Sequence, residues 1–349
     1  MSGGANARAS GGAAETPGPA SAVAGPPPGG AAALPAPSSR VGAWAELLRL
    51  PALFTVPGDA LAGAAASGAR PGPRTLLAIG SSLCLYEAGM ALNDWADRAE
   101  DAVERPHRPL PSGRIRPATA LAAAGALTGA GLALAAGAGR PALTIAAPLA
   151  ATVWAYDLTL KHTPAGPAAM AAARGLDLLL GAAATGGGAR AALPSAALLG
   201  SHTLAVTAVS RRETTGGSVL APLAALATTG ALTGLVARRR TRLPAGRRAA
   251  AAPGLPGSIP APGVADVLRT GLSAVYAATA ARPCFHAVLN PSPPLTQRAV
   301  SGGIRATIPL QAALAARSGA GTTSLLVAAL APAGRWFAGR TAMRKVSIT

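Results

Sequence analysis

The sequence predicts an all-α, polytopic membrane protein. Of its 349 residues, 50% are hydrophobic and only 13% are charged, and the mean hydropathy is +0.37. Several apolar runs reach the roughly 20 residues that a helix needs to cross a bilayer. These runs consist largely of Ala and Gly, which insert weakly but allow close helix packing. We therefore expect a multi-pass helical bundle in the cell membrane.

Positive charge gathers at the ends of these apolar runs, and the formal net charge is +18. Membrane topology and anionic lipid headgroups account for such a pattern. No nucleic-acid motif accompanies the arginines, so we expect a membrane partner and no nucleic acid. The two cysteines, Cys84 and Cys284, form neither a metal-ligand motif nor a disulfide framework.

The chain divides into a tail and a membrane domain. Residues 1–40 contain Gly, Ala, Pro and Ser with almost no large apolar residue, so they cannot form a core and are predicted to be disordered. They also lack the basic start and apolar run of a secretory signal. Residues 41–349 are predicted to form the membrane domain.

The apolar runs place the helices in order. Residues 41–68 indicate an amphipathic helix followed by a kinked span. The residues that interrupt this segment are Glu46, Arg49, Pro51, Pro57 and Asp59. Further spans are predicted at about 74–97, 117–139, 141–160, from 167 onward, 191–210 and 217–237.

A basic run, RRRTRLPAGRR, follows at 238–248, and a Pro/Gly-rich link covers 252–263. Beyond the link, residues 264–289 indicate an interrupted helix and residues 300–333 one or two more, which gives about nine helices in total. The positive-inside rule fits the ends of the second, fourth and sixth spans if the N-terminus is cytoplasmic. The same orientation puts the basic run outside, a conflict that the sequence does not resolve.

The end of the second predicted span carries an acidic motif. Asn93, Asp97 and Asp101 recur every four residues, which places them on one helical face, and Asp94 borders that face. Such oxygen ligands suit hard cations such as Mg²⁺. The alternative is an ordinary solvated helix end.

A basic loop follows the acidic motif. It carries Arg105, Arg108 and Arg114, and prolines at 106, 109 and 111 stiffen it. Fixed arginines beside metal-binding carboxylates are what a diphosphate site requires. His107 is expected to be exposed in this loop, without a ligand role.

Other polar and charged residues cluster at the same predicted membrane face. They are Tyr156, Asp157 and Lys161, then Arg174 and Asp177, and finally Arg211 and Glu213. Charges inside spans usually face a cavity or a partner. Each group also has a structural alternative: Asp157 and Lys161 as an i,i+4 pair, Arg174 and Asp177 as an intramembrane pair, and Arg211 as a charged helix end.

The segment NDWADRAED at 93–101 resembles the NDxxDxxxD motif of the UbiA superfamily of intramembrane prenyltransferases. The segments YEAGMAL at 86–92, ERPHRPLPSGRI at 104–115, YDLTLKHTPAGPAAMAAARGLDLLLG at 156–181 and RLPALFTVPGDALAG at 49–63 resemble it too. Within the superfamily, these segments and the region from Asn290 onward are most similar to the UbiA-like EboC branch.

The resemblance implies a bundle of nine transmembrane helices around a central cavity. It implies Mg²⁺ ligands at Asn93, Asp94, Asp97 and Asp101, of which the three aspartates are also the catalytic residues. It further implies a prenyl diphosphate and a small-molecule acceptor, often aromatic, as substrates. The expected substrate-binding residues are Arg105, Arg108, Arg114, Tyr156, Lys161, Arg174, Asp177 and Arg211.

One departure from the family pattern stands out. The second aspartate motif, DxxxD, should fall near the end of the sixth span, but HTLAVTAVSRRETTGG places Thr207 and Arg211 at that spacing. Arg211 could replace a metal as a fixed cation. The alternatives are a non-catalytic lipid-binding or transport-associated protein on the same scaffold, or an unrelated cation-coupled transporter.

Overall fold

The computed structural model describes residues 40–186, 188–213, 216–238 and 263–346. Within these ranges every regular element is helical, which confirms the predicted all-α class. The predicted disordered tail up to residue 39, the basic run from residue 239 and the Pro/Gly-rich link up to residue 262 lie outside the described residues. The topology conflict raised by the basic run therefore stays open.

The helices follow the apolar runs of the sequence. The first half of the domain contains α1 (Arg40–Leu47), η1 (Leu50–Thr55), α2 (Pro57–Ala66), α3 (Pro73–Ala96), α4 (Arg98–Glu104), α5 (Pro117–Ala138), α6 (Arg140–Ala155) and η2 (Tyr156–Leu160). The second half contains α7 (Gly166–Ala184), α8 (Ala189–Ser210), α9 (Leu220–Ala237), α10 (Val264–Leu289), α11 (Pro293–Arg317) and α12 (Gly321–Val346).

Five helical segments in the described ranges are long and apolar enough to cross a membrane. They are Pro73–Ala96, Pro117–Ala138, Arg140–Leu160, Ala189–Ser210 and Leu220–Ala237. Each coincides with a span predicted from the sequence. The predicted total of about nine spans stays a prediction, since the described residues form twelve α-helices of differing length and polarity.

The C-terminal helices differ from the sequence prediction. Residues 264–289 form one continuous helix, α10, which runs through Pro283 instead of breaking there. Helices in a bundle tolerate proline when their neighbours accommodate it. Here Gly302 of α11 makes room, because a Cβ at that position would lie 2.7 Å from the Pro283 ring. Two helices, α11 and α12, then occupy the region where one or two were expected.

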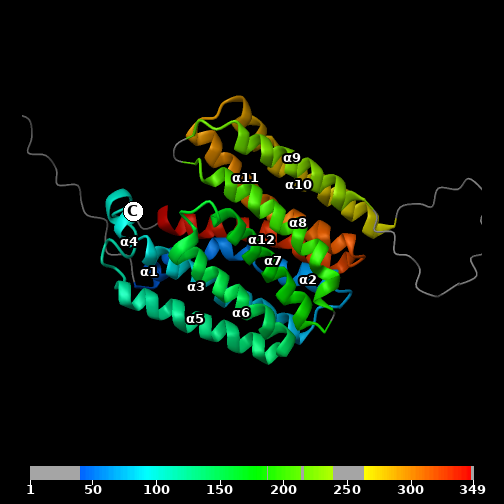
Figure 1. Cartoon of the computed structure of the whole chain (residues 1–349), viewed down its shortest axis with the longest axis horizontal. Coiled ribbons are helices and arrows are strands. Elements are labelled where there is room, and N and C mark those ends of the chain that lie inside the picture. The colour runs from blue at the N-terminus through cyan, green and yellow to red at the C-terminus, as the bar shows by residue number, and fades with distance from the viewer. Residues whose placement is uncertain (1–39, 187, 214–215, 239–262, 347–349) are drawn as a thin grey trace, which may run out of the picture. The chain divides into compact units, whose positions relative to one another are not determined.

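The bundle has two packed groups with α2 and α7 between them (Figure 1). On one side α3, α5 and α6 share a core of small side chains and leucines. On the other side α8, α10 and α11 pack with α7 around the buried Tyr276. Helix α7 contacts α2, α3, α6 and α8, so residues on α7 can reach either group.

Glycines bring α2 and α7 into backbone contact. A Cβ at Gly181 would collide with the backbone of Ala60, and a Cβ at Gly63 would collide with the carbonyl of Leu178. Small residues at such crossings let membrane helices approach closely. This approach holds Asp59 of α2 beside the polar residues of α7.

Candidate functional site

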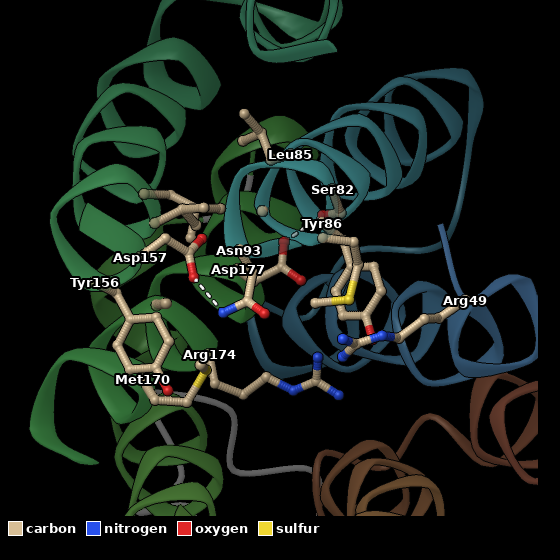
Figure 2. Close-up of a pocket in the computed structure, with 15 residues that line it drawn as sticks. Arg49, Ser82, Leu85, Tyr86, Asn93, Tyr156, Asp157, Met170, Arg174 and Asp177 are labelled. Atoms are coloured by element: carbon tan, nitrogen blue, oxygen red, sulfur yellow. Dashed lines mark hydrogen bonds between the residues drawn. The ribbon is translucent and has the colours of Figure 1, made fainter. Parts of the chain in front are cut away.

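A cavity of about 270 Å³ opens between α3, the end of α6, η2 and α7 (Figure 2). Its apolar wall includes Leu85, Met90, Leu149, Val153 and Met170. Its polar groups are Arg49, Ser82, Asn93, Tyr156, Asp157, Arg174 and Asp177. A charged head with an apolar chain is the kind of ligand that such a divided lining fits.

A hydrogen bond joins α3 to η2 in the lining of the cavity. Asn93 donates from Nδ2 to Oδ1 of Asp157 at 3.2 Å. One turn earlier on α3, a Cβ at Gly89 would lie 3.0 Å from Val153 Cγ1. This glycine lets α3 approach α6, and the approach brings the two polar side chains together.

The backbone of η2 is a π-helical turn, in which the amide of Lys161 donates to the carbonyl of Tyr156 at 2.9 Å. In this wider turn, residues four apart, such as Asp157 and Lys161, no longer lie on the same face of the helix. Lys161 consequently forms an ion pair with Asp97, not with Asp157 as one sequence interpretation held. Short π-helical turns are frequent at functional sites.

Arg49 and Arg108 of the basic loop form ion pairs with the aspartates of the acidic motif. Arg49 Nη2 lies 3.1 Å from Asp94 Oδ1. Arg108 Nη1 lies 2.7 Å from Asp101 Oδ2 and 3.6 Å from Asp94 Oδ1. Asp94 and Asp101 thus share Arg108, whereas Asn93 and Asp97 contact Asp157 and Lys161, so the four motif residues do not converge on one point in this structure.

The other two loop arginines lie farther from the cavity. Arg105 contacts Asp101 at 3.5 Å. Arg114 contacts Glu46 of α1 at 2.8 Å and donates to the carbonyl of His107 at 2.6 Å. Neither side chain lines the cavity, so their predicted role as substrate ligands stays a prediction.

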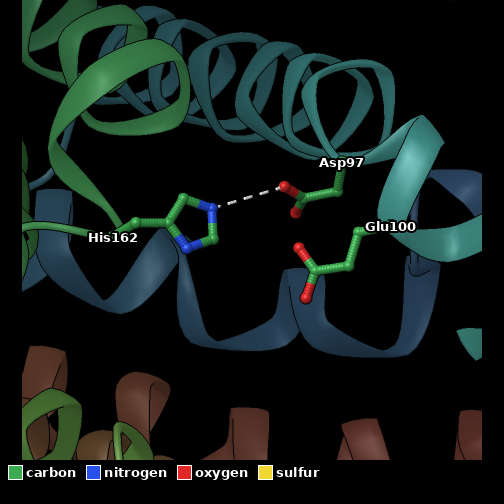
Figure 3. Close-up of side chains that lie close together, drawn as sticks. All are labelled: Asp97, Glu100 and His162. Atoms are coloured by element: carbon green, nitrogen blue, oxygen red, sulfur yellow. Dashed lines mark ion pairs between the residues drawn. The ribbon is translucent and has the colours of Figure 1, made fainter.

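One group of side chains in the described residues has the spacing of metal ligands. Ligand atoms of Asp97, Glu100 and His162 all lie within 4.8 Å of one another (Figure 3). His162 Nε2 is 3.7 Å from Asp97 Oδ1. Of the four predicted metal ligands, only Asp97 belongs to this group, and His162 was not assigned a role from the sequence.

A second polar network lies deeper in the bundle. Arg174 Nε is 3.1 Å from Asp59 Oδ2, and Gln311 of α11 donates to Asp59 Oδ1 at 2.6 Å. Ser82 of α3 donates to Asp177. Arg174 and Asp177 thus have separate partners, in place of the i,i+3 pair considered from the sequence.

Arg211 lies at the end of α8, where it donates to the carbonyl of Thr163 in the loop after η2. It does not line the cavity. Its proposed substitution for a metal remains a prediction. The contact does place the ends of α8 and η2 at one end of the bundle.

Sequence reasoning missed several of the site's polar groups. Arg49 and Asp59 were treated as interruptions of the first span, while Ser82 and Gln311 drew no attention. Glu87 of α3, by contrast, stood out in the sequence as a carboxylate inside an apolar run, with helix packing and a cavity wall as the two interpretations. It is buried, and its carboxylate oxygens have no hydrogen-bond partner among the described residues. A charged residue inside an apolar run is expensive, so Arg49 and Asp59 did carry a usable signal.

The fold and the site define a class: a helical membrane protein with a polar, arginine-bearing cavity near one end of its bundle. The model of the UbiA prenyltransferase family matches residues 52–214, which span the cavity and the acidic motif. This match confirms the resemblance to the UbiA superfamily that the motifs predict. The match favours the UbiA-like scaffold over an unrelated transporter, and the EboC assignment stays a prediction.

Two curated proteins are similar in sequence to part of this chain. A digeranylgeranylglyceryl phosphate synthase of Methanopyrus kandleri is 35% identical over 35% of this chain and 45% of its own. A synthase of the same name from Natronomonas pharaonis is 33% identical over 48% of this chain and 61% of its own. The matched region thus spans about half the length of these relatives.

A solved structure shows the same fold. It is a UbiA homologue from Archaeoglobus fulgidus bound to GPP and Mg²⁺, with a TM-score of 0.53 at 17% identity. The similarity covers 84% of this chain and 99% of that one. The helical arrangement is therefore shared over almost the whole of that protein.

Proposed function

We propose that this chain is a membrane prenyltransferase that moves the prenyl group of a prenyl diphosphate to a small-molecule acceptor. The observation that carries the proposal is the divided cavity. Arg49 and Arg174 reach it from different elements (Figure 2), while Leu149, Val153 and Met170 line its apolar part. The guanidinium groups fit the diphosphate, and the apolar wall fits the prenyl chain.

The acidic motif supports Mg²⁺ as the cofactor. Asn93, Asp94 and Asp97 offer the amide and carboxylate oxygens that Mg²⁺ prefers, and Asp97 lies beside Glu100. When bound, Mg²⁺ would neutralise charge that develops on the leaving diphosphate. Asp101 is held by two arginines, so we assign it to positioning Arg108.

The chain's own residues provide the remaining chemistry. The bond between C1 of the prenyl group and the diphosphate oxygen breaks, and the diphosphate leaves with the bonding electrons. Arg49 and Arg174 stabilise its charge. The acceptor forms a bond to C1 and releases a proton, for which Asp157 and Asp177 are the carboxylates that line the cavity. The apolar wall excludes water, which would otherwise capture the allylic cation.

The names of the relatives favour one class of acceptor. Both synthases are named for digeranylgeranylglyceryl phosphate, which supports a glyceryl phosphate lipid with a free hydroxyl over an aromatic ring. The A. fulgidus homologue, bound to GPP and Mg²⁺, supports the donor class and the cofactor.

A non-catalytic role is the second candidate. The three aspartates of the acidic motif already have cationic partners in the protein, in Arg49, Arg108 and Lys161. The second aspartate pair of the family is also missing from the end of α8. A protein that binds a prenyl lipid without turnover would have these features.

Turnover separates the two candidates. The purified chain in neutral detergent would be given Mg²⁺, geranylgeranyl diphosphate and a glyceryl phosphate acceptor, and diphosphate release and prenylated product would both be measured. We expect equal amounts of the two, and a loss of about a hundredfold or more in Asp94→Asn. Asp266→Asn on α10 is the matched control, with unchanged activity expected. Tight binding with neither product would establish the non-catalytic candidate.

A further inference from the structure

A second pocket, of about 150 Å³, lies on the hairpin of α10 and α11. We call it the hairpin pocket. The basic residues that line it are Arg282 and His286 of α10 and Arg298 and Arg305 of α11. All four side chains are exposed. Among the described residues, none of the four has an acidic partner within 4.0 Å. The pocket is therefore a concentration of positive charge without internal compensation.

The hairpin pocket lies beside a membrane-crossing helix. Helix α9 is apolar and long enough to span, and α10 runs antiparallel along it. At one end the amide of Gly217 donates to the carbonyl of Pro291 at 2.7 Å. At the other end Arg269 Nε donates to the carbonyl of Ala237 at 3.0 Å. Since the two helices are joined at both ends, α10 shares the membrane environment of α9.

The surface around the pocket is apolar. Phe285 and Leu289 on α10 and Ile304 on α11 are large hydrophobic residues that face outward. Figure 1 shows α9 and α10 along one edge of the bundle, away from α5. Exposed apolar side chains at the perimeter of a membrane bundle face the acyl chains of lipid.

The pocket lies at the same end of the bundle as the candidate site. Arg211 contacts Thr163 beside η2, and Gly217, six residues further along the chain, donates to Pro291 in the turn between α10 and α11. Side chains on a helix tilt toward its N-terminus, so Arg298 and Arg305 on α11 tilt toward this turn, whereas Arg282 on α10 tilts away from it. Along their helices, Arg282 and Arg298 lie about 10 Å or less from the turn and Arg305 about 18 Å, so Arg282 and Arg298 are the arginines nearest the headgroups. From this distance the long arginine side chains can extend to the lipid headgroups.

We propose that the hairpin pocket binds the phosphate headgroup of an anionic glycerophospholipid. Its arginines supply planar, charged donors for phosphate oxygens, and the surrounding apolar residues contact the acyl chains. This site is separate from the cavity and does not depend on the chain being a prenyltransferase. It would fix the α10–α11 hairpin to the leaflet from which the candidate site opens.

Lipid binding to the full chain in neutral detergent tests the proposal. Fluorescent phosphatidylglycerol would be titrated, with unlabelled phosphatidylglycerol, phosphatidylcholine or inorganic phosphate as competitors. The pocket variant is Arg282→Gln/Arg298→Gln/Arg305→Gln. The control is Arg70→Gln/Arg74→Gln/Arg140→Gln, which removes the same charge from exposed arginines at the opposite end of the bundle.

We expect the wild type and the control to prefer phosphatidylglycerol over phosphatidylcholine. The pocket variant should bind phosphatidylglycerol at least about tenfold more weakly, because each arginine near an anionic surface contributes about fivefold. Equal losses in the two triple variants would overturn the proposal, as would displacement by inorganic phosphate as effective as displacement by lipid. If the triple variant does not fold, Arg298→Gln alone should lose about fivefold, and an unchanged affinity would count against the site.

Discussion

Arg49 contacts Asp94 across 45 residues of sequence, with 3.1 Å between Nη2 and Oδ1. Arg49 is also the one non-glycine residue in the described ranges with a positive φ, at 48°. A left-handed backbone is unfavourable for arginine and often marks functional sites. The strained residue thus brings its charge both to the acidic motif and to the cavity.

The first prediction distinguishes the effect of the charge of Arg49 from the effect of its left-handed backbone conformation. Arg49→Asn removes the cation but tolerates the left-handed conformation, whereas Arg49→Gln removes the cation and keeps the strain. Both variants should bind geranylgeranyl diphosphate about tenfold to a hundredfold more weakly, since each loses a charge-assisted contact. Arg49→Asn should retain the higher thermal stability. Wild-type affinity in both variants would exclude Arg49 from the site.

The second prediction concerns the buried network of Asp59, Arg174 and Gln311. Asp59→Leu leaves Arg174 without its carboxylate partner and should cost about 3–5 kcal/mol of unfolding free energy. The double variant Asp59→Leu/Arg174→Leu should recover part of this loss, because no unpaired charge remains. Unfolding in mixed micelles with increasing SDS would measure the unfolding free energies of the wild type, both single variants and the double variant. Additive losses would show that the two residues act independently.

The third prediction concerns the contact of α2 with α7. Gly181→Ala places a methyl group against the backbone of Ala60 and should destabilise the protein by about 1–3 kcal/mol, as overpacking does. Gly230→Ala on α9 is the control, since nothing lies within 4 Å of its added Cβ. The control should be neutral or slightly stabilising. Equal unfolding midpoints for both variants would contradict the close crossing.

The fourth prediction concerns Mg²⁺. Asp97→Asn should raise the Mg²⁺ concentration needed for half-maximal diphosphate binding by about tenfold, since Asp97 belongs both to the acidic motif and to the group with Glu100 and His162. Glu100→Gln should have a smaller effect, because Glu100 is exposed. Glu104→Gln, one turn further along α4, serves as the control. Binding that survives chelation unchanged would remove Mg²⁺ from the account.

The helices were predictable because their determinants are local. Apolar runs bounded by arginine, proline or glycine placed α3, α5, α6, α8 and α9 within a few residues of their actual ends. Pro283 misled the prediction of α10, because proline breaks an isolated helix but not one that a neighbouring glycine accommodates.

The site was predictable only in part, because its pairings are tertiary. The spacing of Asn93 and Asp97 indicated a polar helix end, and the charge of Arg174 indicated a cavity. The contact of Gln311 with Asp59 joins residues 252 positions apart, and no local pattern indicates it. The π-helical turn before Lys161 likewise redirected that side chain to Asp97.

The most direct test is a structure of the full chain with Mg²⁺ and geranyl thiodiphosphate, an analogue whose thio substitution slows cleavage. The account predicts the diphosphate within hydrogen-bonding distance of Arg49 and Arg174, with the prenyl chain along Val153 and Met170. A diphosphate bound outside the cavity, with Arg49 still occupied by Asp94 alone, would contradict it.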